Sequence, residues 1–128
     1  MTLDTVITLV RETLCRPADE PVQGDQLLFH DLAFTSLDLL DLLYRVEEHF
    51  GLSIPEGTLY GLARGELDEA VFAERGILTP LGRERLMALL FDTPPPMFHD
   101  KIHAQTLPRY CTVAAIARLV DHKLAEHA

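Results

Sequence analysis

The segment between Thr35 and Gly51 constrains the fold of this chain more than any other. When successive residues are placed 100° apart, its apolar residues occupy one wide arc. The arc comprises Leu39, Leu40, Leu42, Leu43, Val46 and Phe50. Thr35, Ser36 and Asp38 suit a helix N-terminus, and Gly51 suits a helix end. The pattern therefore predicts an amphipathic helix over residues 36–50 that buries this arc in a core.

The rest of the sequence also predicts helices. Apolar residues at helical spacing indicate helices over 2–15 and 112–125, and shorter ones over 66–75 and 80–91. No segment alternates for long enough to predict a sheet, and there is no internal repeat. A chain of 128 residues can bury a sufficient core without metal or disulfide support. We therefore expect an all-α fold in one domain, residues 1–128.

Charge and cysteine content narrow the classes of partner and compartment. The chain has 20 Asp and Glu against 11 Lys and Arg, a formal net charge of -9. This excess repels nucleic acids and anionic membranes and favours encounter with basic protein surfaces. Cys15 and Cys111 make no disulfide framework and are expected to be reduced. Without a leader-like N-terminus or a long apolar run, we expect a soluble, cytoplasmic monomer with no membrane span.

Ser36 stands where a loop becomes the predicted helix. A serine at this position can simply cap the helix. Its hydroxyl can instead be an exposed attachment point, because acidic and apolar residues follow it on the outer arc of the helix. That arc carries Leu37, Asp38, Asp41, Tyr44, Arg45 and Glu48. Charged residues on an outer face are often only solvated, so the arc alone leaves both interpretations open.

A specific motif surrounds Ser36. It reads Asp31-Leu32-x-x-x-Ser36-Leu37-Asp38, continues as an acidic helix to Glu47-Glu48-His49-Phe50-Gly51, and is followed by Ile54-Pro55. This motif resembles the acyl carrier proteins of fatty acid and polyketide synthesis over roughly residues 3–56. The resemblance implies an acyl-carrier-like four-helix bundle, closed by the helix over 112–125. Extra helices are then expected as an insertion at about 60–110, because long structureless loops are uncommon in compact domains.

The resemblance also implies a function for Ser36. In that family the serine at this position receives 4′-phosphopantetheine from coenzyme A, and the terminal thiol of the arm carries acyl groups as thioesters. A phosphopantetheinyl transferase makes the attachment, so the carrier itself is expected not to be an enzyme. Acyl-transferring or synthase enzymes with basic docking surfaces are the other expected partners. By resemblance the docking residues are Leu37, Asp38, Asp41, Glu47 and Glu48, to which the helical arc adds Tyr44.

Thr35 is a departure from the family pattern, which commonly has Asp before the serine. The substitution removes a charge that could help the transferase. An unmodified carrier-like interaction module is therefore the alternative function.

Other chemistry has weaker support in the sequence. His99, His103 and Cys111 could supply metal ligands, but histidines after a run of prolines are more typical of solvated groups, so no metal is predicted. Ser36 lacks the flanking glycines of a hydrolase nucleophile. The segment 76–86 is similar to the wing and last helix of winged-helix transcription factors, yet no basic recognition helix accompanies it.

Overall fold

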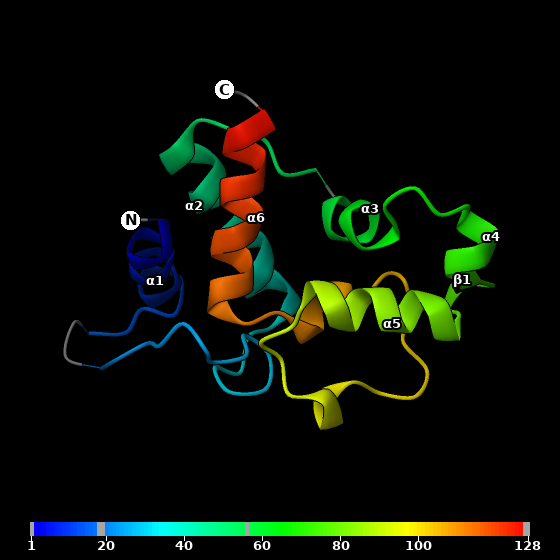
Figure 1. Ribbon diagram of the computed structural model, residues 1–128. Coiled ribbons are helices and arrows are strands. Elements are labelled where there is room, and N and C mark those ends of the chain that lie inside the picture. Colours follow the sequence, from blue (N-terminus) through cyan, green and yellow to red (C-terminus); the bar gives the residue numbers. More distant parts are fainter. Residues whose placement is uncertain (1, 18–19, 56, 127–128) are drawn as a thin grey trace.

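Three helices form a bundle on one side of the molecule. The computed structural model describes residues 2–17, 20–55 and 57–126; the outermost residues of the predicted domain, 1 and 127–128, lie outside this range. Helix α1 (Thr2–Thr13) packs against both α2 (Ser36–Phe50) and α6 (Val113–Glu126), as Figure 1 shows. The predicted carrier-like helical fold is confirmed, with one very small sheet added to it.

A second group of elements lies beside this bundle (Figure 1). It contains the helices α3 (Thr58–Arg64), α4 (Glu69–Phe72) and α5 (Pro80–Leu89), of which α3 and α4 both pack on α5. The strands β1 (Ala73–Glu74) and β2 (Ile77–Leu78) lie between α4 and α5. Two 3-10 helices, η1 (Pro95–Met97) and η2 (Leu107–Tyr110), then lead to α6.

The helix predicted over 66–75 is wrong in its extent. Only Glu69–Phe72 is helical, and the chain then forms an antiparallel pair in which Ala73 lies opposite Leu78. Arg75 and Gly76 connect the strands with φ values of 54° and 79°. Positive φ at both central residues is the geometry of the tight hairpin turn that matches strand twist. Strands of two residues are too short to show an alternating pattern, so they could not be predicted from the sequence.

The buried face of α2 is narrower than predicted. Leu42 and Val46 are fully buried, and Leu39, Leu43 and Phe50 are partly buried against the core. Leu40 was expected in the core, and this is wrong, because its side chain is 64% exposed. A helix that packs at the edge of a bundle buries only part of a wide apolar arc, and Leu40 lies beyond that part.

A polar bridge ties the end of α5 to α6. The Arg118 guanidinium donates to the two Asp92 carboxylate oxygens at 3.1 and 2.9 Å, and the Thr112 hydroxyl donates at 2.7 Å. Burial by itself raises the pKa of Asp92, but these hydrogen bonds and the Arg118 charge outweigh it and leave the pKa below its usual value. Arg118 also lies over the Phe91 ring, 4.4 Å from its centroid. The bridge fixes where the chain re-enters the bundle.

Candidate functional site

Thr35, and not Ser36, caps helix α2. The Thr35 hydroxyl accepts a hydrogen bond from the Asp38 amide at 3.2 Å, and the Asp38 carboxylate accepts one from the Thr35 amide at 2.8 Å. This reciprocal pair is a capping box, which satisfies two amides that the helix leaves unpaired. Ser36 is therefore not the cap of α2, because Thr35 already makes the capping hydrogen bonds.

Ser36 is the first residue of α2, and it is exposed. Within the described part of the chain its hydroxyl makes no hydrogen bond, so no base is held against it to activate it from inside the molecule. The free amides and aligned dipoles at a helix N-terminus favour an anionic group such as a phosphate ester. The site thus combines an accessible, unengaged hydroxyl with a local field that suits a phosphodiester.

An apolar stripe runs along the outer face of α2 from Ser36. Leu37, Leu40 and Tyr44 are 77%, 64% and 59% exposed, and they lie on one face because they are spaced three and four residues apart. We call these three residues the apolar stripe. Sequence reasoning missed Leu40, although its spacing from Leu37 and Tyr44 was the available signal. Exposed apolar side chains that gather in this way are typical of a protein contact surface.

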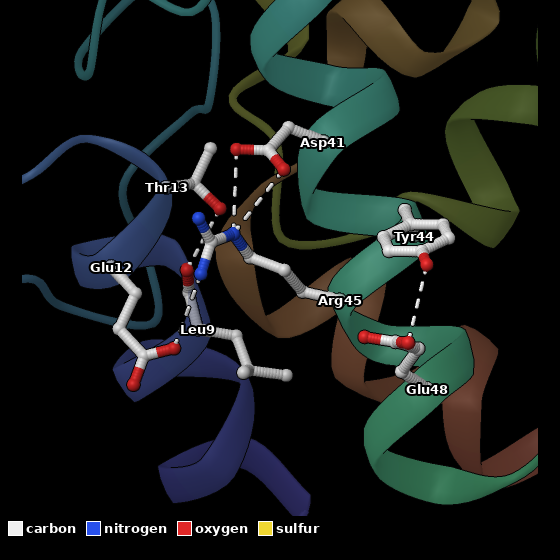
Figure 2. A network of polar contacts seen from close by, with 7 residues as sticks. All are labelled: Leu9, Glu12, Thr13, Asp41, Tyr44, Arg45 and Glu48. Atoms are coloured by element: carbon white, nitrogen blue, oxygen red, sulfur yellow. Dashed lines mark hydrogen bonds and ion pairs between the residues drawn. The ribbon is translucent and has the colours of Figure 1, made fainter.

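Two carboxylates beside Tyr44 have different hydrogen-bond partners (Figure 2). The Tyr44 hydroxyl donates to Glu48 at 3.2 Å, and this hydrogen bond, together with the Glu48 charge, raises the pKa of Tyr44. Asp41 is instead paired with Arg45, whose Nε lies 3.3 Å from both carboxylate oxygens. Arg45 also reaches Glu12 on α1 at 3.5 Å. Glu48 therefore carries a charge that no basic side chain of the described region offsets.

Two of the predicted docking residues have roles inside the fold. Asp38 belongs to the capping box and is only half-exposed. The Glu47 carboxylate accepts a hydrogen bond from the Ile54 amide at 2.6 Å, which holds the loop that follows α2. The other four predicted docking residues are exposed, namely Leu37, Asp41, Tyr44 and Glu48. These four are available to a partner, whereas Asp38 and Glu47 bind backbone amides of the chain itself.

The candidate metal ligands are not brought together. In the described residues there is no group of three or more His, Cys, Asp or Glu side chains that could hold a metal ion. Cys111 is buried, and burial raises its pKa to about 12, which disfavours the thiolate form that binds metals. Cys15 is exposed, and both thiols are free.

Comparison with known families places Ser36 within a recognised domain. Residues 4–64 match the family model described as phosphopantetheine attachment site, a range that runs from α1 through α3. Searches of curated proteins and of solved structures each returned no match. Domains of this family are the site of covalent 4′-phosphopantetheine attachment, so the predicted cofactor is confirmed for the domain. No helix among the described residues is long and apolar enough to span a membrane. Residues 4–64 therefore match the phosphopantetheine-attachment family, in agreement with the resemblance to acyl carrier proteins.

Proposed function

We propose that this protein is an acyl carrier in which Ser36 bears the 4′-phosphopantetheine arm. The observation that carries the proposal is the exposed, unengaged hydroxyl of Ser36 at the start of α2, within the matched family range. In the attachment step, the Ser36 oxygen bonds to the phosphorus that bears the pantetheine of coenzyme A, and adenosine 3′,5′-bisphosphate leaves. The transferase takes the hydroxyl proton. The arm then carries acyl groups as thioesters in fatty acid, lipid or polyketide-type biosynthesis.

We further propose that the chain is a single carrier domain with an insertion at about residues 60–110. Two contacts support this organisation. Helix α6, which follows the insertion, packs against α1, and the Asp92–Arg118 bridge joins the part of the insertion just after α5 to α6. The insertion is thus anchored where the chain returns to the bundle.

Intact-mass spectrometry tests the carrier proposal directly. Incubation with a broad-specificity phosphopantetheinyl transferase, Mg²⁺ and coenzyme A is expected to add the mass of one 4′-phosphopantetheine. The exposure of Ser36 makes this addition possible without unfolding of α2. A carrier of known competence serves as the positive control for each transferase. If several active transferases leave the mass unchanged, the carrier proposal fails.

Docking of partner enzymes is expected to use the outer face of α2. The apolar stripe supplies contact area, and the exposed Glu48 supplies a charge that steers a basic partner surface. Glu48→Lys is expected to lower kcat/KM for loading by the transferase roughly five- to tenfold, with a smaller effect at high salt. Glu66→Lys is the matched control, since Glu66 is exposed in the loop between α3 and α4. An equal effect of both substitutions would indicate net charge alone and contradict docking at this face.

Thr35 favours one alternative, an interaction module that is never modified. Thr35→Asp is expected to increase the rate of loading, because Asp caps a helix as well as Thr does and restores a charge beside Ser36. Thr35→Asn keeps the cap without the charge, so we expect it to load like the wild type. Timed mass spectra compare the three proteins. If only the Thr35→Asp variant is loaded, the natural protein is the interaction module that is never modified.

A further inference from the structure

A pocket of about 320 Å³ lies where the loop before α2 meets the segment between α5 and α6. Its volume is at the lower end of the range for small-molecule sites. The loop contributes Phe29 and His30, and the later segment contributes Met97, His99, Arg109 and Tyr110. Only the loop side falls in the range matched by the phosphopantetheine-attachment family. The pocket is therefore created by the residues that this chain adds to the matched domain.

Internal hydrogen bonds hold both walls of the pocket. The Leu28 amide donates to the Cys111 carbonyl at 3.1 Å, which joins the loop to the start of α6. The Arg83 guanidinium donates to the carbonyl of His99 at 3.0 Å and to that of Phe98 at 3.2 Å. The Tyr110 ring stacks on Phe98 with centroids 5.2 Å apart. The pocket is thus formed before any ligand enters it.

The lining has an apolar floor and a rim of nitrogen donors. Leu27 and Tyr110 are buried, and Met97 is partly buried. Arg109, His30 and His99 are exposed at the rim. Among the residues that the structure describes, no acidic side chain lines the pocket, and Arg109 makes no ion pair. An unpaired guanidinium beside imidazole donors suits a carboxylate, and the floor suits a short hydrocarbon.

The pocket is within reach of an arm on Ser36. The Phe34 amide donates to the Leu28 carbonyl at 3.0 Å, and Leu28 stands between the pocket residues Leu27 and Phe29. The two residues from Phe34 to Ser36 span at most about 7 Å. A 4′-phosphopantetheine arm is about as long as four to five extended residues, or ~15 Å. The arm is therefore long enough to fold back and place its thioester at the pocket.

We infer that this pocket receives the acyl group carried on Ser36, and that this acyl group ends in a free carboxylate. The inference rests on the proposed carrier function and names its cargo class, the half-thioester of a dicarboxylic acid. Arg109 binds the distal carboxylate, and the floor covers the hydrocarbon between carboxylate and thioester.

A matched pair of cargoes tests the inference. The transferase is supplied with glutaryl-coenzyme A or pentanoyl-coenzyme A, whose acyl groups have equal chain length and differ only in the terminal carboxylate. The rate of thioester cleavage by hydroxylamine is followed by mass spectrometry and divided by the rate for the free acyl-pantetheine. We expect the glutaryl protein to be protected roughly three- to tenfold more than the pentanoyl protein. Amide NMR shifts should change around Arg109 and His99 for the glutaryl protein alone.

Variants separate the pocket from the carrier function. Arg109→Ala is expected to abolish the extra protection of the glutaryl group and leave the pentanoyl protein unchanged. Arg85→Ala, at an exposed position of α5, is the matched control and should behave as the wild type. If acyl arms load but the two cargoes are equally protected, or the glutaryl arm shifts no pocket amide, the pocket inference is overturned and the carrier proposal stands. Failure to load any arm overturns both.

Discussion

A Ser36→Ala variant is expected to gain no 4′-phosphopantetheine at all, because the substitution removes the oxygen that forms the phosphodiester. The chain contains only one other serine, Ser53, which is exposed in the loop after α2. Ser53→Ala is therefore the matched control and should load like the wild type. Intact mass after incubation with transferase and coenzyme A distinguishes the two variants. Residual loading of Ser36→Ala would place the arm on another side chain.

The structure predicts that this loss is not a folding effect. Thr35 and Asp38 make the capping box, so Ser36→Ala removes no hydrogen bond within the described residues, and alanine is the best helix former. The free energy of unfolding should change by less than about 0.5 kcal/mol. Thr35→Ala, in contrast, should cost about 1 kcal/mol because it removes the cap. Urea unfolding followed by circular dichroism measures both changes, and a large loss in Ser36→Ala would show a structural role for this serine.

Helix α2 could be predicted because its signals are local. The capping residues, the apolar arc and Gly51 all lie within one stretch, and the structure begins and ends the helix as expected, at Ser36 and Phe50. Leu40 was misplaced because burial depends on which neighbours a helix has, and the arc alone does not give them. The sequence alone could not predict that the Ser36 hydroxyl is left without a hydrogen bond, because Thr35 and Ser36 can both cap a helix.

The added segment could be predicted only in part, because non-local contacts define it. Helix α5 was expected over residues 80–91, and in the structure Thr79 caps it, because the Thr79 hydroxyl accepts a hydrogen bond from the Gly82 amide at 3.0 Å. Helix α3 was not predicted, since Gly57, Gly61 and Gly65 obscure its pattern. The pocket joins residues 27–30 to residues 93–110, and nothing local in either segment indicates the other. Long-range pairing of this kind has no signature in sequence periodicity.

Gly82→Ala is expected to destabilise the protein by about 3 kcal/mol, although alanine normally stabilises a helix relative to glycine. Gly82 lies in the first turn of α5, against the end of α4. A Cβ atom placed there would lie 2.0 Å from the Phe72 carbonyl oxygen and 3.3 Å from the Phe72 ring. That carbonyl cannot easily move away, because it accepts hydrogen bonds from the Thr79 amide at 2.9 Å and the Thr79 hydroxyl at 3.1 Å. Relief of the clash would therefore break the junction between α4 and α5.

Gly61→Ala is the matched control for this prediction. Gly61 is also helical, and a Cβ atom there would meet nothing within 4 Å, so we expect a gain of about 0.5–1 kcal/mol. Urea unfolding and hydrogen exchange of both variants also test whether the insertion belongs to one cooperative domain. If it does, Gly82→Ala lowers the protection of α1, α2 and α6 amides together with those of α5, because Phe72 belongs to the common core. Loss of protection confined to residues 58–110 would show that the insertion is a separate folding unit. If Gly82→Ala instead raises the free energy of unfolding, α5 does not lie against Phe72.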